Sequence, residues 1–142
     1  MTEQNETRSE VVPVLVAALA CDVAVADPST GKKNLIGVFD RINVTKFPTQ
    51  RPISLYIKLT DAEGYYAIDV RYVQVGTGNI LATAEGELRS TDRLRSLDLA
   101  IEFPPLVIPT QGRYEFQVWA NSMFLGGAFV DAVPRTQPEA TG

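Results

Sequence analysis

Two residue types that often carry out chemistry in proteins are scarce in this sequence. The 142 residues contain no histidine and a single cysteine, Cys21. Without histidine there is no Ser-His-Asp or Cys-His catalysis, no His-ligated zinc or haem, and no imidazole pH switch. A single cysteine excludes an internal disulfide and a cysteine cluster for zinc or iron–sulfur. Any chemistry must therefore come from carboxylates and arginines, and we expect no cofactor and no metal.

Carboxylates gather at two predicted turns, Asp27 in one and Asp61 with Glu63 in the other. Calcium takes about six to eight oxygen ligands, and neither turn has the dense Asp-x-Asp pattern that would supply them. We therefore expect solvated turn carboxylates and no metal site. Two acids about 5–10 Å apart in a cleft would suit a carbohydrate-active protein. Because spacing in the sequence does not test such a pair across sheets, this alternative stays open.

Charged residues also occur at two other places that deserve a functional interpretation. Asp40 and Arg41 follow Phe39 inside a predicted strand, where they form either a polar site on a sheet or a charged pair that guards an edge strand. The guarding role is the more common one. A small basic loop, formed by Arg89, Arg93 and Arg95, is typical of a solvated loop because no aromatic residues lie between the arginines.

The most informative apolar residues lie near the carboxyl end, at Trp119, Met123 and Phe124. In the alternating segment 114–120, Trp119 falls on the face opposite to Phe116 and Val118. Tryptophan and methionine are enriched at protein interfaces. These three residues are therefore a candidate interface, and the alternative is a strand that is covered on both faces.

The paired glycines of the chain are predicted to serve the backbone and not a ligand. Neither Gly76-Thr-Gly78 nor Gly126-Gly127 opens a helix, so no helix amino terminus would face a phosphate there. Gly126-Gly127 interrupts an apolar strand, which indicates a β-bulge or a close approach of another backbone segment.

The charge and the apolar segments limit the partners and the location. With 13 Lys and Arg against 17 Asp and Glu, the net charge is −4, which argues against a nucleic-acid surface. The apolar stretch 14–21 ends at Cys21 like a lipoprotein signal, but residues 2–10 are acidic, and Pro13 and Asp22 leave too short a run for a membrane span. We expect a cytoplasmic protein with no membrane contact, in which Cys21 is a small buried residue.

Apolar and polar residues alternate with a period of two in most of the chain, as they do in half-buried strands. About eight strands are predicted, with turn residues between them and no crossover helix. Their ranges are 14–26, 35–44, 53–61, 65–75, 80–88, 94–103, 114–120 and 123–130. This pattern predicts an all-β fold, an antiparallel β-sandwich of the immunoglobulin-like or C2-like kind. Residues 11–133 would form the domain, and residues 1–10 and 134–142 would be mobile tails.

Three segments carry a resemblance to a known family: residues 20–42, with the run Asn-Leu-Ile-Gly-Val-Phe-Asp, residues 53–59 and residues 112–116. Together they resemble a family of small bacterial proteins of unknown function that are predicted to be single β-sandwich domains. The resemblance implies the fold, a soluble location and a single domain, and it transfers no catalytic residue.

The sequence therefore favours a non-enzymatic binding or structural module of a bacterial cell, such as a subunit of a larger assembly. We expect a protein partner or self-association, and the candidate residues are Trp119, Met123 and Phe124, with Asp40 and Arg41 as a candidate polar site. The alternative is a carboxylate-based enzyme or a β-sandwich that binds carbohydrate or another ligand.

Overall fold

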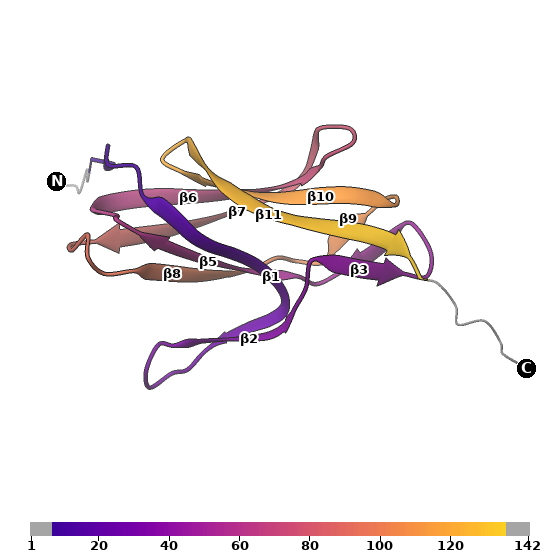
Figure 1. Ribbon diagram of the computed structural model, residues 1–142, viewed down its shortest axis with the longest axis horizontal. Coiled ribbons are helices and arrows are strands. Elements are labelled where there is room, and N and C mark those ends of the chain that lie inside the picture. Colours follow the sequence, from indigo (N-terminus) through magenta and orange to yellow (C-terminus); the bar gives the residue numbers. More distant parts are fainter. Residues whose placement is uncertain (1–6, 136–142) are drawn as a thin grey trace, which may run out of the picture.

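The computed structural model describes residues 7–135, which form eleven strands and no helix (Figure 1). In chain order the strands are β1 (Val14–Ala26), β2 (Lys33–Val38), β3 (Arg41–Val44), β4 (Thr49–Arg51), β5 (Ser54–Thr60), β6 (Gly64–Gln74), β7 (Asn79–Ser90), β8 (Leu97–Glu102), β9 (Leu106–Ile108), β10 (Gly112–Ala120) and β11 (Met123–Pro134). The prediction of an all-β fold is thus confirmed, and the described strands outnumber the eight expected.

The strands form three open sheets. A four-stranded sheet has the order β2-β1-β5-β8, and all of its pairs are antiparallel. A five-stranded sheet has the order β3-β11-β10-β6-β7 and is antiparallel except for the β11–β3 pair. A two-stranded sheet joins β4 to β9.

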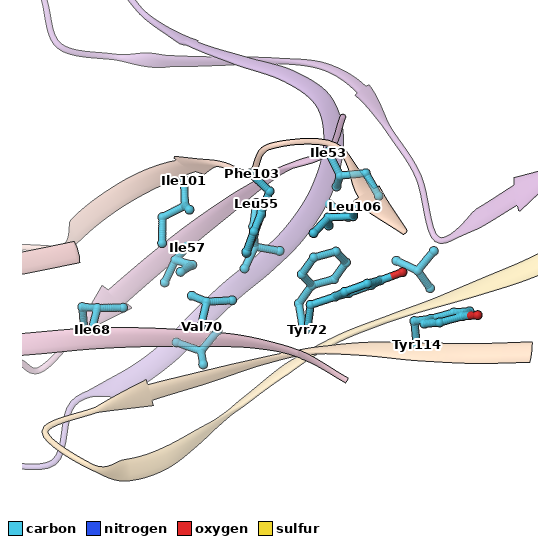
Figure 2. Close-up of a cluster of buried hydrophobic side chains, with 14 of the residues drawn as sticks. Ile53, Leu55, Ile57, Ile68, Val70, Tyr72, Ile101, Phe103, Leu106 and Tyr114 are labelled. Carbon is cyan, nitrogen blue, oxygen red and sulfur yellow. The ribbon is translucent and has the colours of Figure 1, made fainter. Parts of the chain in front are cut away.

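The core lies where the two larger sheets face each other (Figure 2). Alternation along β5 turns Leu55, Ile57 and Leu59 inward, and each is fully buried. Side chains of β6 and β10 meet them from the other sheet. An aromatic cluster fills one end, with ring centroids 5.0–5.6 Å apart, and its members are Tyr72, Tyr114, Phe116 and Phe103.

The predicted strand 35–44 is two strands that belong to different sheets. β2 ends at Val38 on the four-stranded sheet, and β3 begins at Arg41 on the five-stranded sheet. At the crossover, the N–H of Phe39 donates to the carbonyl of Ala20 at 3.0 Å, and the carbonyl of Asp40 accepts from the N–H of Asp131 at 2.9 Å. Asp40 therefore lies between two strands, whereas the sequence predicted it inside one strand, and that prediction is wrong.

The proline-rich segments contain two short strands that alternation did not predict. β4 pairs with β9 through three residues on each side. The prolines at positions 48, 52, 104, 105 and 109 lie outside both strands, so every residue of the pair keeps its N–H group for the ladder. Leu106 and Ile108 are buried, so β9 closes one end of the core.

Strand β1 joins two partners that lie one after the other along its length. Residues 14–21 pair with β5, and residues 21–26 pair with β2 as a two-stranded ribbon that extends away from the two facing sheets (Figure 1). An ion pair joins the start of β2 to β8, because Nζ of Lys33 lies 2.7 Å from Asp98, whose other oxygen accepts from the Tyr56 hydroxyl at 3.0 Å.

The first strand also settles the environment of the single cysteine. Cys21 is a free thiol with none of its surface exposed, which confirms that it is a small buried residue.

Within residues 7–135, no helix is long and apolar enough to cross a membrane. Of the predicted amino-terminal tail, residues 7–10 are described, and the N–H of Ser9 donates to the carbonyl of Tyr65 at 3.0 Å. The predicted tail at 134–142 lies outside the described residues beyond Arg135.

Candidate functional site

The outer face of the five-stranded sheet carries Trp119. In β10 the side chains of Tyr114, Phe116 and Val118 are buried in the core, so the alternate residues point away from it. Trp119 lies on this outer face, as the alternation predicted, and its ring is half-buried by neighbours on the same face.

Trp119 is the centre of a cluster of aromatic and charged side chains, which we call the Trp119 cluster: Trp119, Phe124, Arg71, Asp69 and Gln117. The ring centroid of Phe124 is 5.3 Å from that of Trp119, and Cζ of Arg71 lies 4.2 Å above the indole. Nε of Arg71 lies 3.0 Å from the Asp69 carboxylate, and the indole N–H donates to the side-chain oxygen of Gln117 at 3.3 Å. The carboxylate and the indole together fix the guanidinium in place.

A β-bulge brings Phe124 next to Trp119. The register of β10 on β11 shifts after Val118, which pairs with Gly126, whereas Trp119 pairs with Phe124 and Leu125 is the extra residue. Phe124 is 51% exposed and Met123 is half-buried, so the structure brings all three of the predicted interface residues to the β10–β11 hairpin.

The glycine pair in β11 serves the backbone, as predicted. Gly126 has a φ of +140°, which favours glycine, and it lies at the bulge. A Cβ on Gly127 would lie 2.2 Å from the carbonyl oxygen of Phe116, so only glycine fits beside β10 at this position. At the hairpin turn, Asn121 and Ser122 both have positive φ, which is the geometry of a tight two-residue turn.

A hollow of about 420 Å³ adjoins the Trp119 cluster on the outer faces of β6 and β7. Asp69 of β6 pairs directly with Glu85 of β7, and directly opposed residues have Cβ atoms about 4.5–5.5 Å apart. Glu87, two residues further along β7, accepts a hydrogen bond from the Tyr65 hydroxyl, which raises the pKa of that tyrosine. The hollow therefore combines carboxylates with Arg71, which also belongs to the cluster.

The other predicted polar site lies elsewhere. Arg41 begins β3, at the end of the molecule away from the β10–β11 hairpin (Figure 1). It pairs in register with Asp131, but that carboxylate binds the guanidinium of Arg113 at 2.8 and 3.1 Å, which lowers its pKa. Asp40 and Arg41 thus do not join the Trp119 cluster.

The acidic turns have local partners. Asp27 accepts hydrogen bonds from the Thr30 hydroxyl at 2.8 Å and the Ser29 N–H at 3.2 Å, and both lower its pKa. Asp61 binds Arg93 at 2.8 Å, which lowers the pKa of the carboxyl group. In the described part of the chain, no three His, Cys, Asp or Glu residues are placed together to hold a metal ion.

Comparison with known families adds one finding. A family model described as a family of unknown function, DUF6941, matches residues 16–127, from the first strand into the last. The chain belongs to the DUF6941 family. This agrees with the family of unknown function that the sequence resembled, and no curated protein matches the chain. The matched range includes the whole Trp119 cluster.

Sequence reasoning identified only part of this cluster. Trp119 and Phe124 were predicted, whereas Arg71 and Asp69 were not singled out. The alternation of segment 65–75 places both charged residues on the outer face of β6. Their position beside Trp119 depends on the pairing of β10 with β6, which joins residues about fifty positions apart and leaves no local signal.

Proposed function

We propose that this protein is a non-enzymatic binding module of the bacterial cytoplasm that holds a protein partner on the Trp119 cluster, as a subunit of a larger assembly. The observation that supports this proposal most directly is the grouping of Trp119, Phe124 and Arg71 on the outer face of a rigid sheet. Tryptophan and arginine are the residue types that contribute most to binding energy at protein interfaces.

The charges around the cluster indicate the kind of partner. Four carboxylates lie on the same outer face, at Asp69, Glu85, Glu87 and Glu115. A partner that offers an apolar side chain surrounded by lysine or arginine complements this face. The same face also carries arginines, at Arg71, Arg89 and Arg113, so charge does not separate a different protein from a second copy of the chain. We also infer that the two facing sheets form a β-sandwich of the immunoglobulin-like or C2-like kind.

The test is affinity purification from the native host with matched surface variants. Trp119→Ser and Phe124→Ser remove the aromatic rings, and Ile36→Ser removes an exposed apolar side chain from the ribbon, on a different sheet. We expect recovery of the partner to fall by more than about 30-fold for Trp119→Ser, the factor that corresponds to a loss of about 2 kcal/mol. The Ile36→Ser protein should recover as much partner as the wild type.

Two results would contradict the proposal. One is recovery of the wild-type protein alone, as a monomer by light scattering. The other is the same partner recovered equally by the Trp119→Ser and wild-type proteins, when both melt at the same temperature.

The facing carboxylates support a second candidate, a carbohydrate-binding or carboxylate-based catalytic site in the hollow beside the cluster. Asp69 and Glu85 face each other in register on neighbouring strands, and Trp119 offers a ring face nearby. Against it, Asp69 already binds Arg71. Titration of oligosaccharides by NMR tests this candidate: saturable shifts that Glu85→Gln abolishes support it, and an unchanged spectrum contradicts it.

A further inference from the structure

We propose that a basic hollow at the end of the five-stranded sheet binds a phosphate group of a small molecule. Its lining is formed by Arg41, Asn43, Arg51 and Arg135, around a volume of about 470 Å³. A second hollow of about 460 Å³ shares Asn43 and Arg51, continues between β3 and β4, and adds Lys46. We call the two together the basic hollow. It lies away from the Trp119 cluster and has no part in the function proposed above.

The charge of the basic hollow is opposite to that of the whole chain. Four of the 13 lysine and arginine residues line it, although the chain has a net charge of −4. No aspartate or glutamate of the described residues is among its lining side chains. Like charges held close together repel each other and destabilise the folded state, so a bound anion would stabilise this end of the molecule.

Arg51 is fixed by contacts that leave donors for a ligand. One Nη atom lies 2.9 Å from the carboxylate of Asp22, and Cζ lies 5.2 Å from the ring centroid of Phe39. A guanidinium has five N–H donors, and these contacts use only some of them. The side chain is therefore ordered before a ligand arrives, which lowers the entropy lost on binding.

Arg41 and Arg135 are brought together by the pairing of β3 with the end of β11. Arg41 faces Asp131 in register, but Asp131 is already bound through both oxygens to Arg113. The backbone N–H of Arg135 donates to the carbonyl of Val44 at 2.8 Å, which holds its Cα beside the end of β3. Among the described residues, no carboxylate forms an ion pair with Arg41 or Arg135, although Arg41 lies near enough to Asp131 to contribute to the lowered pKa of that carboxyl group.

The donors of the basic hollow match the chemistry of a phosphate. A guanidinium binds phosphate oxygens through two parallel N–H groups, and the uncharged side chains of Asn43, Thr45 and Gln50 add further donors. A phosphate ester carries close to two negative charges, which Arg41 and Arg135 balance, because the charge of Arg51 is already shared with Asp22. Each hollow is within the range of about 300–1,000 Å³ found for small-ligand sites, so one can hold the phosphate and the other the group attached to it.

The experiment is a calorimetric titration of the full chain at low ionic strength, with inorganic phosphate, pyrophosphate and a nucleoside monophosphate in separate arms. Chloride at the same ionic strength is the reference. We expect saturation at one equivalent, and weakening of at least tenfold in both Arg41→Gln and Arg135→Gln. Tighter binding of the monophosphate than of inorganic phosphate would identify an ester as the ligand, and the reverse would identify the free anion.

The matched control is Arg95→Gln. It removes one positive charge from the exposed loop before β8, at the opposite end of the molecule (Figure 1). The affinity of the Arg95→Gln protein for phosphate should stay within twofold of that of the wild type. Equal weakening in all three variants would show a response to net charge alone and would overturn the proposal. Absence of saturable binding up to millimolar phosphate, or unchanged binding in the Arg41→Gln and Arg135→Gln proteins at unchanged melting temperature, would also overturn it.

Discussion

Cys21 is buried although the register of β1 on β5 places its side chain opposite Ser54, on the outer face of the four-stranded sheet. Burial and the neighbouring carboxylate of Asp22 both raise the pKa of the thiol. Because the thiolate is the reactive form, we expect a thiol reagent such as Ellman's reagent to label the native protein about a hundredfold more slowly than the unfolded protein. Equal rates at pH 8 would show that the thiol is accessible.

Tyr72 gives the fold a dependence on alkaline pH. Burial raises its pKa above the ordinary value of 10.0, so the folded state holds the phenolic proton more tightly than the unfolded state. The stability that this difference contributes is fully present below pH 10.0 and is lost as the pH rises above it. The Tyr72 hydroxyl also donates to the carbonyl of Val107 at 3.1 Å.

Tyr72→Phe tests both effects because it keeps the ring in the core. We expect the variant to lose about 1 kcal/mol of unfolding free energy at pH 7, from the missing hydrogen bond. Its stability should then decline less steeply than that of the wild type between about pH 10 and 12. Urea denaturation of both proteins at neutral and alkaline pH measures how the unfolding free energy of each changes with pH. Parallel curves for the two proteins would show that Tyr72 does not cause the loss of stability at alkaline pH.

For a single residue, the local sequence pattern predicts the face of the strand on which its side chain lies, but not the side chains that it contacts. The position of Trp119 on the outer face follows from alternation within residues 114–120. Its contact with Arg71 requires the register of β10 on β6, and its contact with Phe124 requires a bulge. The glycine pair indicated a bulge or a close backbone approach, but not that the bulge would place Phe124 opposite Trp119.

Strand β11 contains the sharpest steric constraint. A Cβ on Gly127 would lie 2.2 Å from the carbonyl oxygen of Phe116, and β10 and β11 are joined through nine register pairs, so neither backbone can move freely. We expect Gly127→Ala to destabilise the protein by at least about 2 kcal/mol, measured by urea denaturation.

Gly76→Ala is the matched control for this substitution. Gly76 lies in the turn after β6, its φ is outside the left-handed region, and nothing lies within 4 Å of its added Cβ. The unfolding free energy of the Gly76→Ala protein should differ from that of the wild type by no more than about 0.5 kcal/mol. A Gly127→Ala protein as stable as the Gly76→Ala protein would contradict the close packing of β10 on β11.

Elements with strong alternation were predictable, and those defined by tertiary contacts were not. The predicted range 114–120 matches most of β10, because each buried side chain there alternates with an outward one. The break after Val38 was missed because Val38 and Phe39 before it, and Ile42 and Val44 after it, are typical of one apolar strand, while the backbone changes sheets at Asp40. β4 and β9 were missed because three residues between prolines are too few to show a period.

At the scale of the whole molecule, two surfaces of different character lie at different ends. The Trp119 cluster and its carboxylates occupy the sheet face near the β10–β11 hairpin, and the basic hollow lies where β3 and β4 meet the end of β11 (Figure 1). The all-β fold was predictable from period and composition. The grouping of side chains in these two regions was not, because each combines residues from strands that are distant in the sequence.

A photo-crosslinking amino acid placed at the Trp119 cluster, in living cells of the native host, tests whether this surface holds a protein partner. We would replace Phe124 in one variant and Ile36 in another, since their side chains are similarly exposed, at 51% and 59%. We expect a discrete cross-linked protein partner from position 124 and none from position 36. Cross-links from position 36 alone, or no partner from position 124 in a correctly folded variant, would contradict this expectation.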